Sequence, residues 1–198
     1  MIRNNLAKLL IDRGIKATML AEKTGIAKST LSKISNNATA KIEYSTINSI
    51  CSVLRITPSD FFEYTPINCS YNFEITDDFV PTLVVDTSRE LEFKIFGSIT
   101  FTKNEIKISK IEYEGVLKHL ITNNENSDYT LMFEGELAPI TGINLSIFDE
   151  IPISFQTDIE EEFSDYVQEA TKKQLREVIR IKEIDFGTYG ANIKITLK

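Results

Sequence analysis

The spacing of hydrophobic positions changes near residue 66, and this change divides the chain into two parts with different expected structures. In the first part, apolar residues recur every three or four positions, as on the buried face of a helix. Thr57 followed by Pro58 adds a helix start, because threonine caps a helix and proline suits its first position. Ser45 is an expected cap in the same way. We therefore expect helices over five stretches: residues 4–13, 17–24, 28–35, 46–54 and 58–64.

After Cys69 the hydrophobic period becomes two residues, the period of a strand that buries one face. We expect a strictly alternating strand over the nine residues 105–113. The other expected features are strands at 71–75, 83–85, 91–96, 99–101 and 129–133, a polar loop at 123–128, a terminal hairpin at 184–197, and turns or bulges at Gly115, Gly135 and Gly142.

Residues 154–181 interrupt this alternation and predict one long helix. Thr157 and Glu160 have the spacing of a capping box, so we expect Thr157 at the N-cap of a helix of about 22 residues. The second part is therefore predicted to be an α+β domain of residues 69–198, an antiparallel β-sheet packed on one long helix. The expected buried stripe of this helix is Ile159, Phe163, Tyr166 and Ala170.

The two parts also differ in charge. Residues 1–65 contain nine Lys or Arg and five Asp or Glu, a net charge of +4. Residues 66–198 contain thirteen Lys or Arg and twenty-four Asp or Glu, a net charge of −11. Basic surfaces attract phosphates and acidic ones are repelled by them. We therefore expect nucleic acid at the first part, and a protein or a small ligand at the second.

The sequence contains little that indicates catalysis. Cys51 and Cys69 lack CxxC spacing and His119 is the only histidine, so no metal site is predicted. Cys51 is interpreted as a small buried hydrophobe. We expect no enzyme activity and no cofactor. We also expect a cytoplasmic protein, because no apolar run approaches about 18 residues and Met1-Ile2-Arg3 leads directly into a polar helix.

Residues 18–34 contain the most informative pair of expected helices. Gly25 lies where the first helix must stop, because glycine adopts a left-handed backbone at least cost. Leu31 and Ile34 are spaced to face inward in the second helix. The remaining face is short, polar and cationic, with no acid. Hydroxyl and ammonium groups of this kind meet base edges and phosphates in the major groove of DNA.

The stretch LAEKTGIAKSTLSKI resembles the helix-turn-helix of the Cro/phage-repressor type, the XRE family. The shared features are Leu20-Ala21, a glycine four residues on, a hydrophobe after it, and a Ser/Thr-rich helix that ends in isoleucine. The resemblance covers residues 2–64, about a third of the chain. It implies that residues 1–65 form a five-helix helix-turn-helix bundle that binds DNA. The chain departs from the family at Ala17, often Gln, and at Asn36-Asn37, where Gly is frequent.

The resemblance implies two kinds of contact with double-stranded DNA. Residues expected to read bases are Lys28, Ser29, Thr30, Ser32 and Lys33. Residues expected to contact phosphates are Thr18, Asn36, Asn37 and Lys41. We therefore predict a sequence-specific DNA-binding transcriptional regulator, a repressor of the phage or mobile-element type.

The second domain, residues 69–198, is expected to dimerise or regulate the protein. One short helix contacts few bases, whereas two helices related by a two-fold axis read a palindromic operator. We therefore expect a homodimer, with the exposed face of the long helix and an edge strand as alternative interfaces. An antagonist protein or a small ligand at this domain is left open. The alternative function is an antitoxin-like interaction protein, whose acidic domain binds a protein partner while the basic domain autoregulates.

Overall fold

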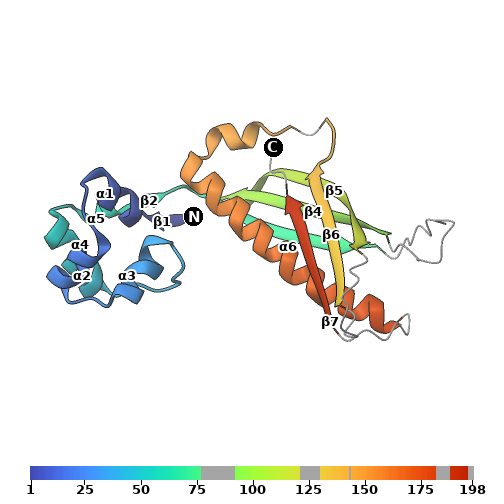
Figure 1. Ribbon diagram of the computed structural model, residues 1–198. Helices are drawn as coiled ribbons and strands as arrows, with labels where there is room; N and C mark the ends of the chain where they lie inside the picture. The colour runs from blue at the N-terminus through green and yellow to red at the C-terminus, as the bar shows by residue number, and fades with distance from the viewer. Residues whose placement is uncertain (77–91, 121–129, 143, 182–187, 196–198) are drawn as a thin grey trace. The chain divides into compact units, whose positions relative to one another are not determined.

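The computed structural model describes residues 1–76, 92–120, 130–142, 144–181 and 188–195 (Figure 1). The chain divides into two compact units, Met1–Pro66, here unit 1, and Ile67–Lys198, here unit 2. Unit 1 is mainly helical, and unit 2 combines a sheet with one long helix. The strand expected at 83–85, the loop at 123–128 and the first arm of the terminal hairpin at 184–186 lie outside the described residues.

Unit 1 is built from short helices joined by connections of three to eight residues. Their bounds are α1 Leu6–Asp12, α2 Ala17–Thr24, α3 Lys28–Ser35, α4 Tyr44–Leu54 and α5 Pro58–Phe61. The helices predicted at 17–24 and 28–35 are confirmed at both ends. The start of α5 is confirmed as well, because the Thr57 side chain accepts a hydrogen bond from the Asp60 N–H, and the Asp60 carboxylate accepts one from the Thr57 N–H.

Four helix ends differ from the expectation, one of them, the end of α1 at Asp12 instead of residue 13, by a single position. α1 starts at Leu6, because Asn4 belongs to a strand. α4 starts at Tyr44 with the extended Glu43 as its N-cap and no side-chain cap bond, so Ser45 lies inside the helix and is not its cap. α5 ends at Phe61, and residues 62–64 continue as a strand instead of a helix.

A two-stranded antiparallel sheet, which the sequence pattern did not predict, joins the two ends of unit 1. β1 Ile2–Asn4 pairs with β2 Phe62–Tyr64. The pairing extends one step further: the Met1 amino group donates to the Thr65 carbonyl at 2.6 Å, and the Thr65 N–H donates to the Met1 carbonyl at 3.0 Å. Strands of three residues are too short to show a period of two, so the pattern of hydrophobic residues could not reveal them.

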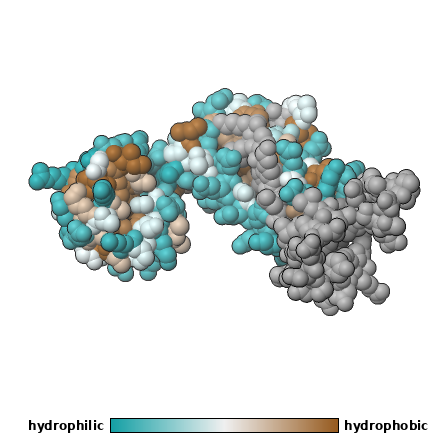
Figure 2. All heavy atoms as spheres, viewed as in Figure 1, coloured by the Kyte–Doolittle hydropathy of each residue, from teal (hydrophilic) through white to brown (hydrophobic). Residues whose placement is uncertain are grey.

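The core of unit 1 takes one to three apolar residues from each helix. Burial of each large member stabilises the unit by roughly 1.5–3 kcal/mol relative to exposure. Cys51 is among them, which confirms its interpretation as a buried hydrophobe. On the face drawn in Figure 2, apolar residues interrupt the polar surface of unit 1. The buried core residues are Leu6, Leu10, Leu20, Ala21, Leu31, Ile34, Ile50, Cys51, Leu54 and Phe61.

Unit 2 is a sheet with one long helix packed across it (Figure 1). Within the described residues the strands are β3 Ile67–Ile75, β4 Glu92–Lys103, β5 Ile106–Leu120, β6 Thr130–Pro139 and β7 Thr188–Ile195. They form one sheet in the order β3-β4-β5-β6-β7. A 3-10 turn, η1 Ser146–Glu150, precedes α6 Ile153–Ile181. Neighbouring strands are antiparallel except β6 and β7, which are parallel.

The last strand corrects the prediction of a terminal hairpin. Gly190 lies within β7, where it pairs with Met132 of β6, and not in a turn. Parallel neighbours need a long crossover connection between them, and α6 is part of that connection. The sequence showed glycines and apolar residues near the end of the chain, but the partner of β7 lies far earlier in the sequence.

The long helix starts earlier than predicted and buries a different stripe. Thr157 lies inside α6 and donates its hydroxyl to the Ile153 carbonyl at 3.3 Å, so the predicted capping box is wrong. Tyr166 is 38% exposed and Ala170 is half-buried, so the predicted stripe is right only at Ile159 and Phe163. The buried residues recur every fourth position: Phe155, Ile159, Phe163, Val167, Thr171 and Leu175.

A β-bulge explains why residues 105–113 do not alternate as predicted. The register between β4 and β5 shifts so that Phe101 faces Ser109 while Thr102 faces Lys107, which leaves Ile108 as the extra residue. Ile106 is 70% exposed and Ile108 is 42% exposed. A bulge restarts the alternation of faces, so residues before and after it follow different phases.

The prediction that three glycines lie in turns or bulges is right for only one of them. Gly115 and Gly135 lie inside β5 and β6 instead, at paired positions of the ladder. Gly142 lies in a turn with φ of +88°, as predicted.

One edge of the sheet is partly covered by a side chain of α6. Gln174 Nε2 donates to the Phe73 carbonyl at 2.9 Å, and its Oε1 accepts from the Ile75 N–H at 2.7 Å. Gln174 thus pairs with β3 as another strand would. An uncovered edge is a template for pairing with a second chain, and here part of that edge is occupied.

Candidate nucleic-acid interface

The turn between α2 and α3 is fixed by Gly25 and by hydrogen bonds beside it. Gly25 has φ of +72°, and its N–H donates to the Ala21 carbonyl at 2.9 Å. The Thr24 hydroxyl donates to the Leu20 carbonyl at 2.7 Å and accepts from the Ile26 N–H at 3.3 Å. A residue with a Cβ would be strained at this backbone, so the terminating role predicted for Gly25 is confirmed.

α3 has one buried side and one exposed side. Leu31 is fully buried and Ile34 is 2% exposed. The five residues expected on the opposite side are all exposed: Lys28, Ser29, Thr30, Ser32 and Lys33. We call these five residues the α3 face. The structure brings them together on one helix, while their contact with DNA stays a prediction.

Both helices of this pair begin without a side-chain cap. The N-cap residues are Lys16 for α2 and Ala27 for α3, and neither makes a side-chain cap bond. The first N–H groups of a helix have no partner within it, and the helix dipole makes this end positive, which suits phosphate oxygens. Thr18 is exposed in the first turn of α2, beside such N–H groups.

The other residues expected at phosphates lie after α3. Asn36 and Lys41 are exposed, whereas Asn37 is half-buried. Asn37 Oδ1 accepts from the Asn4 N–H at 2.8 Å and from Asn4 Nδ2 at 2.6 Å, and the Asn37 N–H donates to the Ile34 carbonyl at 2.9 Å. The side chain of Asn37 is therefore engaged within unit 1.

Asn4 is the residue near this interface that the sequence did not indicate. It was expected in a helix at 4–13, but it ends β1 and is only 5% exposed. Its partners Ile34 and Asn37 are 30 and 33 positions away, so no short-range spacing could have marked it.

The charges of unit 1 leave the α3 face cationic. Lys28 and Lys33 lie in the first and last turns of α3, which contains no acid. Asp60, one of the five acids of the unit, is bound in its capping box. Hydrogen bonds from Thr57 hold the pKa of the Asp60 carboxyl below its ordinary value. With a net charge of +4, unit 1 attracts phosphates.

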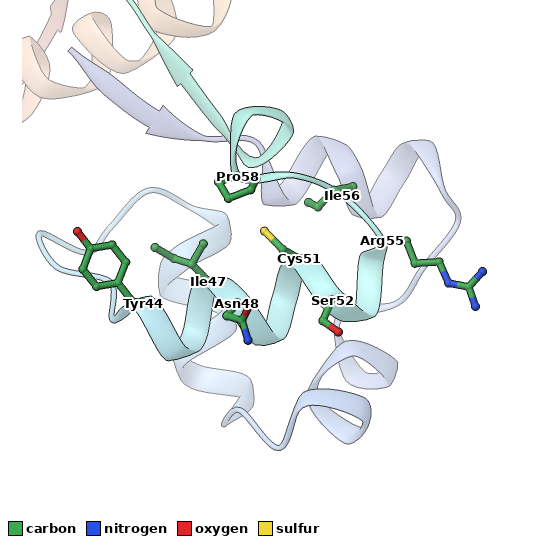
Figure 3. A pocket seen from close by; sticks show the side chains of 8 residues that line it. All are labelled: Tyr44, Ile47, Asn48, Cys51, Ser52, Arg55, Ile56 and Pro58. Carbon is green, nitrogen blue, oxygen red and sulfur yellow. The ribbon is translucent and has the colours of Figure 1, made fainter.

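A groove of about 580 Å³ lies beside α4 (Figure 3). Figure 3 shows Ile47 and Cys51 on the side of α4 towards Pro58, while Arg55 points away. None of the residues expected to contact DNA lines this groove, so it is separate from the α3 face. Its lining residues are Tyr44, Ile47, Asn48, Cys51, Ser52, Arg55, Ile56 and Pro58.

The described part of unit 2 has a smaller hollow in its surface. This hollow of about 210 Å³ is lined by residues that include Lys110 and Glu112, whose charged groups pair at 2.6 Å. Nowhere in the described ranges do three His, Cys, Asp or Glu side chains gather in a way that would hold a metal ion. No helix in the part of the chain that the structure describes is long and apolar enough to cross a bilayer.

Known proteins match part of the chain. Residues 5–66 match the family model of the Cro/C1-type HTH DNA-binding domain. The uncharacterized HTH-type transcriptional regulator YozG of Bacillus subtilis (strain 168) is 35% identical over 60 residues, which are 30% of this chain and 71% of that protein. A crystal structure of a "putative DNA-binding protein" from Bacteroides fragilis matches with a TM-score of 0.30 and 19% identity, over 32% of this chain and all of that one.

The family model and the curated relative define the class of protein, a DNA-binding regulator with a helix-turn-helix. The chain belongs to the HTH-type transcriptional regulators with a Cro/C1-type HTH DNA-binding domain. The resemblance seen in the sequence is thereby confirmed. The family model ends at Pro66, the last residue of unit 1.

Proposed function

We propose that the protein is a sequence-specific transcriptional regulator, a repressor of the phage or mobile-element type that binds a palindromic operator as a homodimer. The observation that supports base readout is the exposed α3 face, with hydroxyl and ammonium groups and no acid, in a domain of the Cro/C1 type. Lys28, Ser29 and Thr30 form the N-terminal turn, which enters a major groove first in this motif. Lys33, one turn later, would meet a guanine or a phosphate.

Phosphate contacts would flank this face. Thr18 lies beside the uncapped start of α2, and Asn36 and Lys41 lie exposed beyond α3. Such contacts set the register of a protein on the duplex and carry no sequence information. Asn37, with its side chain bound to Asn4, contributes by holding the backbone of this segment rather than by offering a side chain to phosphate.

Unit 2 would form the dimer interface. α3 has eight residues, and a second copy one DNA turn away, about 34 Å, would double the number of bases read. The covered stretch of the β3 edge favours α6 as the interface. Its exposed side is acidic at Glu161 and Asp165 and basic at Lys172 and Lys173, so two antiparallel copies would place acids opposite lysines.

Selection from a pool of random duplexes with the full-length chain tests the proposed function. An inverted repeat should be enriched, and the selected duplex should bind at least about 1,000-fold more tightly than a scrambled one. Lys41→Ala should weaken both duplexes similarly and lower the salt slope of binding by about one. A pool that stays random after selection would overturn sequence-specific binding.

Light scattering on the full-length chain tests the dimer. The expected mass is twice that of the 22.5 kDa chain at micromolar concentration. Lys172→Glu on α6 should weaken the dimer, whereas Lys103→Glu, exposed at the end of β4, should leave it intact. A wild-type monomer at this concentration would contradict the proposed assembly, and equal effects of the two variants would contradict the α6 interface.

A further inference from the structure

The end of α3 is attached to the first strand of the chain by a pair of amides, the buried Asn4 and the half-buried Asn37. Asn4 Nδ2 donates to the Ile34 carbonyl at 2.7 Å and to Asn37 Oδ1 at 2.6 Å. In return, Asn37 Nδ2 donates to the Asn4 carbonyl at 3.3 Å. Both side-chain amides are thus engaged on their donor and acceptor atoms, so this is a satisfied polar network.

Both positions need asparagine for physical reasons. Asn37 has φ of +51°, a left-handed backbone that asparagine tolerates better than other residues with a Cβ. Asn4 is 5% exposed, and its Oδ1 also accepts from the Leu6 N–H at 3.0 Å, at the start of α1. Asn4 therefore binds the start of α1 and the last turn of α3 with one side chain.

β1 is itself fixed by the strand that closes unit 1. Asn4 is opposite Phe62 in the ladder, and Met1 exchanges hydrogen bonds with Thr65. The last turn of α3 is thus connected through Asn37 and Asn4 to the β1–β2 sheet. Leu31 and Ile34 pack α3 on the core, but apolar contacts are not directional and do not fix how far the helix slides or rotates.

We propose that Asn4 and Asn37 are positioning residues for DNA recognition, which lock the last turn of α3 to the β1–β2 sheet and thereby set the angle at which the α3 face meets base edges. This inference rests on the proposed function. Hydrogen bonds to bases require donor–acceptor distances of about 2.7–3.2 Å, so a loosened helix loses them readily. Attraction between lysines and phosphates tolerates small displacements, because it falls off gradually with distance.

The variant that separates positioning from backbone strain is Asn37→Gly, since glycine keeps the left-handed backbone and removes the side chain. In the full-length chain, affinity for the selected duplex should fall about tenfold, and affinity for the scrambled duplex should stay within about twofold. Asn37→Asp retains the acceptor for Asn4 Nδ2 and the Asn4 N–H, so it should retain most of the preference. Asn4→Ala removes the bonds from Asn4 Nδ2 to the Ile34 carbonyl and to Asn37 Oδ1, and it replaces Asn37→Gly if that variant does not fold.

A matched control separates positioning from general loss of stability. Thr57→Ala removes the capping box of α5, which makes no contact with Asn37 in the hydrogen-bond network above, and should lower stability without changing the ratio of the two affinities. Hydrogen exchange on the protein without DNA gives a second readout. The amides of residues 36–38 should exchange faster in Asn37→Gly and at the wild-type rate in Thr57→Ala.

The outcomes are distinguishable. If the wild-type chain prefers the selected duplex and Asn37→Gly keeps that preference, the positioning role is wrong and the proposed function stands. If Thr57→Ala lowers the preference as much as Asn37→Gly does, the effect is one of stability and the positioning role is again wrong. If the wild-type chain prefers no duplex, the proposed function fails and the positioning role fails with it.

Discussion

The residues that determine the structure of unit 1 lie close together in the sequence, whereas those that determine the structure of unit 2 lie far apart. In unit 1, helix ends are set by residues a few positions apart, such as Gly25 after α2 and the Thr57–Asp60 pair at α5. In unit 2, the fold depends on remote partners, such as Gln174 and Phe73, which are 101 positions apart. A fold with local determinants can be inferred one stretch at a time, whereas unit 2 requires knowledge of which strands meet.

The two units also differ in net charge. Unit 1 has a net charge of +4 and a cationic α3 face, whereas unit 2 has a net charge of −11. An acidic unit attached to a DNA-binding one is repelled by phosphates, which leaves its surface to contacts other than DNA. The predictions below test whether each unit depends on its own residues for stability, in order of decreasing expected effect.

Gly115→Ala should damage unit 2 most. A Cβ at this position of β5 would lie 1.9 Å from the Glu136 carbonyl oxygen of β6, so the backbone must move. We expect a loss of about 3 kcal/mol in the free energy of unfolding of unit 2, the upper range for overpacking. Urea unfolding followed by hydrogen exchange in peptides from each unit measures it.

Gly97→Ala is the matched variant for this test. Its Cβ would lie 3.0 Å from side-chain atoms of Leu137 and Phe163, which have some freedom to move, so the loss should be smaller. Peptides of unit 1 should be unaffected by either variant. Wild-type stability of Gly115→Ala would mean that the β5–β6 register is wrong, and equal loss in both units would mean that they unfold as one.

Unit 2 should lose stability in alkali through Cys69. Burial raises the pKa of the Cys69 thiol to about 12, and burial also raises the pKa values of Tyr71 and Tyr113. A raised folded-state pKa contributes stability that is complete below the unfolded pKa, about 8.5 for Cys, and is lost as the pH rises towards 12. The expected slope is at most about 1.4 kcal/mol per pH unit for this one group.

Cys69→Ala should remove the part of this decline between about pH 8.5 and 10, where tyrosines do not yet titrate. Cys51→Ala is the matched control, because burial also raises the pKa of Cys51, but in unit 1. Unfolding of each unit against pH gives the answer. An unchanged alkaline decline of unit 2 in Cys69→Ala would show that Cys69 is not its source.

Thr57→Ala should cost unit 1 about 1 kcal/mol, the usual loss for a helix cap. The Asp60 pKa is lowered by hydrogen bonds from Thr57, so its contribution is present above about pH 4 and is lost as the pH falls through the folded pKa. The stability difference between wild type and Thr57→Ala should therefore shrink in acid. A difference that stays constant from pH 7 to pH 2 would exclude the Asp60 carboxylate as its cause.

The sequence predicted well what depends on neighbours in the chain. The bounds of α2 and α3, the left-handed Gly25 and the exposed side of α3 all follow from spacing and from residue chemistry within a few positions. The family resemblance of the same stretch is confirmed. The long helix of unit 2 was also found, because a polar stretch with apolar residues at helical spacing differs clearly from alternating strands.

Most of the failures are cases of a remote partner or an irregular ladder, and the others are helix starts placed too late. The β1–β2 sheet and Asn4 depend on residues 30 or more positions away. The capping box at Thr157 was wrong because the helix continues through it from Ile153. The parallel pairing of β7 leaves no mark in local periodicity, since it is defined by the strand that it faces. The bulge at Ile108 coincides with a break in the alternation at Ser109 and Lys110, which the prediction overlooked.

The measurement that tests the central claim most directly compares Ser29→Ala and Thr30→Ala with wild type on the selected and scrambled duplexes. Both residues are exposed, so stability should not change. Each variant should lose about 1–3 kcal/mol of binding free energy on the selected duplex and little on the scrambled one. Ser52→Ala, exposed on α4, is the control and should bind as wild type does. If Ser29→Ala and Thr30→Ala also bind the selected duplex like wild type, the α3 face does not read the bases.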